Sequence, residues 1–249
     1  TIVTAYFALP RSKHGHEWFL AQSKKGLLSL CTPLIIFSDY TAVEEYRTSA
    51  MKANPSCDAP TMFIFTPLNV TTTYRRFYKA VEQRFEREAQ RSIHSPALMI
   101  VWYAKVELVD EAARLNPFKS ERFVWLDIAS LRDDDLSFHQ GERWPDPELV
   151  KSRVGVVPGR VTMMTVRGYG PPCGGNDLAY FSHEARRPLA LTQYPRYTNP
   201  LLVPEHWPGE CNPVGCFIVG GLWGGEPIGL ARLRTAFYDV LSNYVEDER

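Results

Sequence analysis

Short apolar runs alternate with amphipathic segments along the first half of the chain. Residues 2–7 are β-branched and aromatic, and residues 34–37 form a continuous apolar run, as in strands buried on both faces of a parallel sheet. Residues 61–65 and 123–126 repeat this pattern, and helical periodicity lies between the runs. The β-α-β alternation predicts an α/β fold with a mostly parallel sheet and helices on both faces.

The helices expected between these strands have recognisable ends. Residues 41–44 form a capping box, which predicts a helix directly after the second strand. The hydroxyls of residues 71–73 can cap a longer helix that reaches about Arg91, and we expect its charged face to be solvated. Residues 97–103 are apolar and are expected to precede a helix that stops at residues 116–117.

The second half of the chain has a different character. Residues 158–213 are dense in proline and glycine, which predicts many turns. Within and after this stretch, residues 161–166 and 189–192 are expected to be strands that could pair antiparallel. Residues 216–225 combine an apolar strand with glycine pairs, and residues 226–245 have the pattern of an amphipathic helix.

The composition excludes two classes of protein. The chain has 249 residues, 45% of them apolar, and its 28 basic and 28 acidic side chains cancel to a formal charge of zero. A disordered segment needs low hydrophobicity and high net charge, and a general nucleic-acid-binding protein usually has a basic surplus. The length suits one domain over residues 1–249, and no apolar stretch approaches the ~18 residues that a membrane span requires.

Several features favour the lumen of the secretory pathway, such as the Golgi. The chain opens directly in a strand, so we expect a trimmed domain whose signal or anchor lies upstream. Five cysteines are too few and too scattered for a disulfide scaffold; Cys211 and Cys216 could be bridged across a turn or be free buried thiols. Asn69 begins a glycosylation sequon, a triplet that also arises by chance.

Polar groups follow three of the predicted strands. Residues 4–6 end the first strand, Asp39 follows the second, and Asp127 follows the run at residues 123–126. In open sheets of this kind, ligands bind beyond the carboxyl ends of the strands. A carboxylate at a strand tip needs a partner, which can be a divalent cation, a backbone nest or a basic side chain. Asp127 could alternatively cap a helix or form a loop salt bridge.

A glycine-rich segment offers a second candidate ligand site. Gly220 and Gly221 precede Trp223, and Gly224 and Gly225 follow it. Glycines allow a ligand to approach the backbone, and a tryptophan can stack on a sugar ring or nucleobase. The same pattern also fits a tight turn from strand to helix with Trp223 in the core. The spacing matches neither a Walker loop nor a dinucleotide fingerprint.

Other catalytic arrangements have little support. The six histidines show no H-E-x-x-H spacing, and His14 and His16 lie in a polar loop where we expect them to be exposed. No G-x-S-x-G nucleophile elbow is present. Cys173 could be considered as a nucleophile, but nothing near it in the sequence would activate a thiol.

Part of the sequence resembles the HtrL/YibB family. The resemblance rests on residues 1–7, residues 35–39, and the stretch from Lys105 through residues 116–118 to residues 123–127. That family is similar to nucleotide-sugar-dependent glycosyltransferases of the GT-A type. The resemblance implies a three-layer α/β/α sandwich in which a nucleotide-binding half, 1–135, is followed by an acceptor-side half, 136–249.

The resemblance also implies a donor site for a UDP- or GDP-linked sugar. Lys105 would lie near the nucleotide or its phosphates, and Gly220, Gly221 and Trp223 would hold the sugar or a glycan, protein or lipid acceptor. The other nucleotide-binding residues would be Thr4, Ala5, Tyr6, Asp39, Asp127, Ile128 and Ala129.

Asp127 would be the first residue of a DxD-like element. There it would bind Mn²⁺ or Mg²⁺, which neutralises the diphosphate leaving group. The second carboxylate of the element is replaced by Ala129. Asp247 and Glu248 resemble the region where related transferases place a catalytic base, although they also read as an ordinary helix end.

Three functions therefore remain open. The leading one is a metal-dependent glycosyltransferase with Asp127 in the catalytic centre. Because of Ala129, a catalytically silent nucleotide- or sugar-binding domain on the same fold is the first alternative. A hydrolase that uses Cys173 or an unidentified carboxylate pair is the second.

Overall fold

A computed structural model gives the structure of most of the chain. It describes residues 1–9, 14–52, 55–88, 90–131, 159, 161–167 and 216–246.

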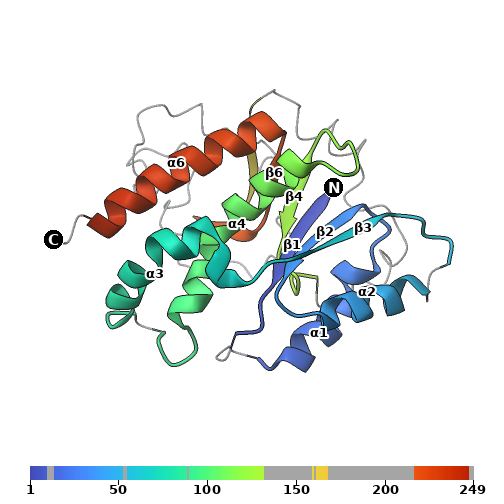
Figure 1. Cartoon of the computed structure of the whole chain (residues 1–249), viewed down its shortest axis with the longest axis horizontal. Helices are drawn as coiled ribbons and strands as arrows, with labels where there is room; N and C mark the ends of the chain where they lie inside the picture. Colours follow the sequence, from blue (N-terminus) through green and yellow to red (C-terminus); the bar gives the residue numbers. More distant parts are fainter. Residues whose placement is uncertain are drawn as a thin grey trace.

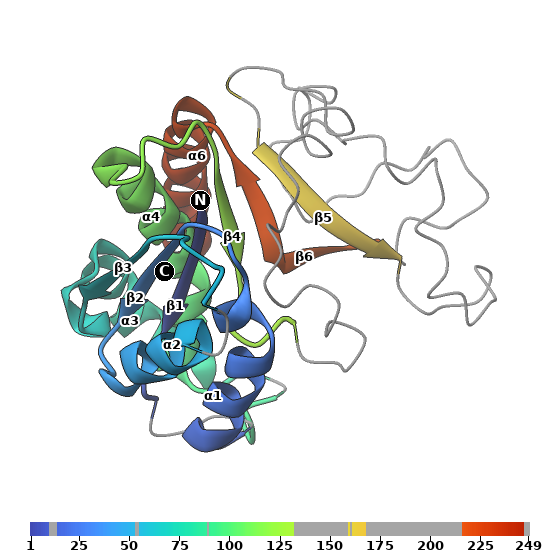
Figure 2. The same cartoon turned by 90° about the vertical axis from the view of Figure 1, so that its right-hand side faces the viewer.

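One six-stranded sheet forms the centre of the molecule, in the strand order β3-β2-β1-β4-β6-β5 (Figures 1 and 2). Its strands are β1 (Ile2–Tyr6), β2 (Leu34–Ser38), β3 (Thr61–Phe65), β4 (Phe123–Leu126), β5 (Val161–Arg167) and β6 (Cys216–Gly225). The first four are parallel, and β6 is antiparallel to both β4 and β5. The sheet is therefore mixed but mostly parallel, as the alternating pattern predicts.

Helices cover both faces of the sheet. The helical elements are α1 (His16–Lys25), η1 (Leu27–Ser29), α2 (Ala42–Lys52), η2 (Leu68–Val70), α3 (Thr72–Phe85), α4 (Pro96–Leu115) and α6 (Pro227–Glu246). Figure 1 shows α3, α4 and α6 grouped on one side of the sheet and α1 and α2 on the other; Figure 2 turns the same layers by 90°. The predicted three-layer α/β/α sandwich is confirmed.

Alternate residues of β1 face two separate cores. Val3 and Ala5 pack with apolar residues of α3, α4 and α6, whereas Ile2 and Tyr6 pack with residues of α1 and η1. This alternation follows from the two-residue period of a strand. Burial on both faces explains why the parallel strands read as continuous apolar runs.

Helix α4 differs from the prediction, because residues 97–103 belong to it. The helix begins at Pro96, and the Ser95 hydroxyl accepts a hydrogen bond of 3.2 Å from the Leu98 amide. A serine cap followed by proline in the first turn is a strong start signal. The helix ends at Leu115, and the C-cap residue Asn116 adopts a left-handed φ of 37°.

Helix α3 begins as predicted but ends earlier. The Thr71 hydroxyl accepts a hydrogen bond of 3.1 Å from the Tyr74 amide. The helix stops at Phe85 instead of near Arg91, because the next backbone bonds tighten to a three-residue spacing. The Glu88 carboxylate then accepts a bond of 3.0 Å from the Gln90 amide, which provides an alternative to helical pairing.

The second half contributes strands to the same sheet. β5, β6 and α6 form where the sequence predicts them, and β5 pairs antiparallel with β6. The expected strand at residues 189–192 lies outside the described residues. None of the helices in the described ranges is both long and apolar enough to cross a lipid bilayer.

A disulfide bond joins Cys31 and Cys57, whose Cα atoms are 5.4 Å apart. It links the segment before β2 to the segment before β3, across the intervening helix α2. The sequence does not predict this pairing, because connectivity cannot be deduced from cysteine spacing alone. The Cys211–Cys216 alternative lies outside the described residues.

Candidate functional site

The sheet has a topological switch point between β1 and β4. From β1 the chain proceeds through β2 to β3 at one edge, then crosses back through α3 and α4 to β4 on the other side of β1. Connections leave in opposite directions there, and α/β proteins bind ligands beyond the carboxyl ends of the strands at such a point. The region beyond the carboxyl ends of β1 and β4 is called the crevice below. The carboxyl ends of β1, β2 and β4 meet at this edge, as the sequence predicts.

Asp127 lies directly beyond the carboxyl end of β4 and is paired with Lys105 of α4. The Lys105 Nζ atom is 2.7 Å from Asp127 Oδ1 and 3.0 Å from Oδ2. The indole Nε1 of Trp125 also donates a hydrogen bond of 2.6 Å to Oδ1. Of the partners considered for this carboxylate, the structure supplies a basic side chain.

Burial makes this ion pair asymmetric. The Lys105 side chain is 11% exposed, whereas that of Asp127 is 40% exposed. The ammonium group also lies over the Trp125 ring, 5.7 Å from its centroid. The lysine is thus held against the sheet by the ring and the carboxylate, and the carboxylate remains accessible from the crevice.

Residues 4–6 form the carboxyl-terminal half of β1 and are buried. Thr4 is 0% exposed, and its Oγ1 atom has no hydrogen-bond partner among the described residues. Ala5 and Tyr6 are also buried, on opposite faces of the sheet. The contacts with a nucleotide that the sequence predicts for these residues stay predictions.

Tyr6 is tied to the start of α1. Its hydroxyl is hydrogen-bonded to His16 Nδ1 over 2.6 Å. The Tyr40 ring lies beside both residues, with centroid distances of 5.9 Å to Tyr6 and 5.8 Å to His16. Burial, followed by the nearby Tyr40, Asp39 and Glu17, raises the pKa of Tyr6 to about 12. The hydroxyl is therefore protonated at neutral pH.

The expected exposure of His14 and His16 is wrong. Both are half-buried, and the His14 ring stacks on Trp18 with centroids 3.8 Å apart. They join an aromatic cluster at the N-terminus of α1, beside the carboxyl end of β1. No spacing rule links Tyr6 to His16, so the cluster could not be found from the sequence, although its aromatic residues are dense there.

Asp39 follows β2 and stabilises the loop after β1. Its Oδ1 atom accepts a hydrogen bond of 2.9 Å from the backbone amide of Ala8. This bond connects the chain segments that leave β1 and β2, which are neighbouring parallel strands. The predicted contact of Asp39 with a nucleotide stays a prediction.

The described residues supply one carboxylate for the predicted metal. Ile128 and Ala129 are both 7% exposed and pack in the core on the α1 side. Within the described ranges, no three His, Cys, Asp or Glu residues lie close enough to hold a metal ion together. A hard cation such as Mg²⁺ is often held by one or two carboxylates plus substrate phosphates. In the structure both oxygens of Asp127 are engaged by Lys105, and one also accepts a bond from Trp125, so its role as a metal ligand stays a prediction.

Trp223 lies in the core. It is 6% exposed and stacks with Trp125, with the ring centroids 6.5 Å apart and the planes at 19°. Gly224 packs against β4, where a Cβ atom would collide with the carbonyl oxygen of Phe123. These contacts agree with the core alternative for Trp223, but the glycines belong to strand β6 instead of a turn. Substrate binding by Gly220 and Gly221 is untested.

Several other candidates lie outside the described residues. These are Cys173, Asp247 and Glu248, so their predicted roles stay predictions.

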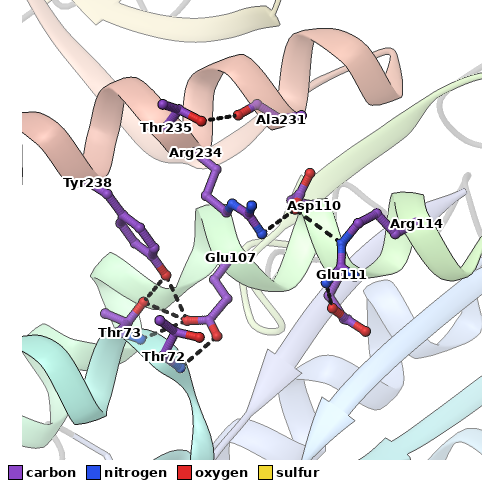
Figure 3. Close-up of polar contacts among 10 residues, drawn as sticks. All are labelled: Thr72, Thr73, Glu107, Asp110, Glu111, Arg114, Ala231, Arg234, Thr235 and Tyr238. Carbon is purple, nitrogen blue, oxygen red and sulfur yellow. Dashed lines mark hydrogen bonds and ion pairs between the residues drawn. The ribbon is translucent and has the colours of Figure 1, made fainter.

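A second polar site lies among α3, α4 and α6, and the sequence does not predict it (Figure 3). The Glu107 carboxylate accepts hydrogen bonds of 2.7 and 2.8 Å from the amides of Thr72 and Thr73. It also accepts bonds from the hydroxyls of Thr73 and Tyr238, over 2.7 and 2.9 Å. A pocket of about 350 Å³ beside it is lined by Thr72, Arg76, Glu107, Arg234, Thr235, Tyr238 and Asp239.

The hydrogen-bond donors around Glu107 favour its charged form. Burial raises the pKa of this carboxyl, but the bonds from Thr73, Thr72 and Tyr238 outweigh burial and lower the pKa below its usual value. Burial, with an added contribution from Glu107, raises the pKa of Tyr238. Since its oxygens are engaged by the N-terminus of α3 and by α6, Glu107 acts as a clamp between three helices.

Comparison with known proteins finds a structural likeness. No family model and no curated protein matches the sequence. The chain is similar to the apo crystal structure of mouse xyloside xylosyltransferase 1, with a TM-score of 0.43 and 14% sequence identity, over 99% of this chain and 73% of that one. Membership of the HtrL/YibB family stays a prediction.

Proposed function

We propose that this chain is a glycosyltransferase that moves a sugar from a nucleoside diphosphate sugar to an acceptor. The observation that supports this best is the Lys105–Asp127 ion pair, because it sets a cation and an accessible carboxylate at the switch point of the sheet. A lysine ammonium is a common phosphate-binding group. The crevice thus contains a group that can attract the diphosphate of such a donor.

The ion pair also addresses an electrostatic problem. A bare carboxylate would repel an incoming diphosphate, whereas Lys105 neutralises Asp127 before the donor arrives. Trp125 Nε1 holds the carboxylate independently of the lysine. We infer that Lys105 can turn its ammonium towards the phosphates while Asp127 keeps its orientation.

Mn²⁺ or Mg²⁺ is the cofactor that we propose with this donor. Held by Asp127, the metal would neutralise the diphosphate leaving group as a Lewis acid. The chain's own contribution is the orientation of that carboxylate by Trp125 and its charge balance by Lys105.

Calorimetry on the full-length protein tests the proposal. Titration with UDP and GDP, with and without Mn²⁺, should show binding of at least one of them. Lys105→Met should weaken that binding about ten-fold, or ~1.4 kcal/mol, and Asp127→Asn should remove its dependence on Mn²⁺. Lys24→Met and Asp58→Asn alter exposed charges elsewhere and serve as controls. Absence of binding to every nucleotide would reject the function.

A silent binding domain on the same fold is the second candidate. The observation that favours it is Ala129, whose buried methyl group stands where a second carboxylate is expected. Release of free nucleoside diphosphate from a panel of UDP- and GDP-linked sugars, incubated with glycan, protein or lipid acceptors, separates the two. Binding without such release would identify the silent domain.

We also propose that the protein works in the lumen of the secretory pathway. The Cys31–Cys57 disulfide supports this location, because such bonds persist in oxidising compartments. Protease protection of the full-length protein in intact microsomes is the expected result. Digestion without added detergent would contradict it.

A further inference from the structure

We propose that Asn69 carries an N-linked oligosaccharide. Asn69, Val70 and Thr71 form the acceptor triplet for this modification. The sequence has seven asparagines, and only Asn69 starts such a triplet without proline in the middle. Asn54 starts the only other candidate, which Pro55 interrupts. The proposal does not depend on the sugar-transfer function.

The fold presents Asn69 in a suitable position. It is exposed and lies in η2, the short turn between β3 and α3. The turn is held by backbone bonds of 3.0 Å from Val70 to Pro67 and 3.2 Å from Thr71 to Leu68. Among the described residues, nothing hydrogen-bonds to the Asn69 side-chain amide. A sugar on this amide therefore breaks no contact of the fold.

Two exposed apolar side chains lie close to Asn69 in the chain. Phe65 is 69% exposed and Val70 is 44% exposed. Among the described strands, β3, which ends at Phe65, is the last on its side of the sheet, and such edges can pair with other chains. A bulky hydrophilic group at this point would shield both the apolar side chains and the end of the strand.

The disulfide provides the second, independent observation. Cys31 and Cys57 are bonded, which indicates folding in an oxidising compartment. The reaction itself uses a polyprenyl-diphosphate-linked oligosaccharide and a luminal oligosaccharyltransferase. Asn69 Nδ2 forms a bond to the anomeric carbon, the bond from that carbon to the phosphate oxygen breaks, and one Nδ2 proton leaves as the polyprenyl diphosphate departs.

Mass spectrometry of the full-length protein from the cells that make it tests the proposal. After treatment with peptide N-glycosidase in H₂¹⁸O, the peptide that contains position 69 should carry ¹⁸O-labelled aspartate. Before treatment, the unmodified peptide should be a minor species. An unmodified Asn69 peptide as the dominant form would overturn the proposal.

Three variants separate the glycan from folding effects. Asn69→Gln and Thr71→Ala should both lose the mass of the glycan, whereas Thr71→Ser should keep it. Thr71→Ala also removes the hydroxyl that caps α3, but Asn69→Gln leaves that cap intact. If Asn69→Gln kept the full glycan mass, the modification would lie elsewhere and the assignment would be wrong.

Discussion

Lys105 and Asp127 are 22 residues apart in sequence, yet the lysine Nζ lies 2.7 Å from one carboxylate oxygen and 3.0 Å from the other. The lysine is nearly buried and the carboxylate is partly exposed. The nearly buried ammonium therefore depends more on its partner than the partly exposed carboxylate does.

We expect Lys105→Met to lower the free energy of unfolding by about 1–2 kcal/mol. The variant leaves Asp127 without its counter-ion, and the exposure of that carboxylate limits the cost. Urea unfolding followed by circular dichroism measures the change, with Lys24→Met as the control on an exposed helix face. The double variant with Asp127→Asn should lose less than the sum of the two single losses; strict additivity would argue against a direct pair.

Glu107→Gln should destabilise the protein by about 1–3 kcal/mol at neutral pH, because the carboxylate accepts bonds from both α3 and α6. Its pKa is lowered in the folded state, so the contribution is present above the ordinary glutamate pKa and is lost as the pH falls through the folded value. The free energy of unfolding, measured at a series of acidic pH values, should depend less on pH for Glu107→Gln than for the unsubstituted protein. Glu121→Gln, at an exposed position, should behave like the unsubstituted protein.

Tyr6→Phe should cost about 1 kcal/mol, since it removes the hydrogen bond to His16. The pKa of Tyr6 is raised to about 12, so its contribution is complete below the ordinary value of 10.0 and is lost as the pH rises towards 12. Across this alkaline range, the melting temperature of Tyr6→Phe should therefore fall less steeply with pH than that of the unsubstituted protein. Identical slopes for both proteins would show that the Tyr6 hydroxyl titrates normally.

Removal of the Cys31–Cys57 disulfide should lower the free energy of unfolding by about 3–4 kcal/mol, as expected for a closed loop with a sequence separation of 26. The double variant Cys31→Ser with Cys57→Ser tests this by urea unfolding. Reduction of the unsubstituted protein should give a matching loss. If reductant lowered the free energy of unfolding of the double variant by a similar amount, the loss would come from another disulfide bond.

Most of the fold could be predicted from the pattern of apolar residues along the chain. Each central strand is apolar on both faces, so the runs at residues 34–37 and 123–126 stand out without further information. The prediction for residues 97–103 is wrong, because a short apolar run does not distinguish a strand from a buried helix segment. The serine and proline at positions 95 and 96 were the signal that marks the helix start.

The candidate site could be predicted in outline only. The carboxyl ends of parallel strands converge whatever the loops do, so Asp127 could be placed in the crevice. The pairing of Asp127 with Lys105 could not be predicted from the chain's pattern, since it depends on the rotation of α4 over the sheet. The Glu107 clamp draws on three helices that are distant in sequence, and no local pattern encodes it.

The position of β6 in the sheet has a consequence for synthesis of the chain. The described residues that border the crevice all precede Leu131, so they leave the ribosome well before β6, which begins at Cys216. Until then β4 lacks β6, the described strand that pairs with its outer side. The nascent protein therefore passes through an interval in which its crevice can assemble while β4 is an open edge, and the arrival of β6 ends that interval.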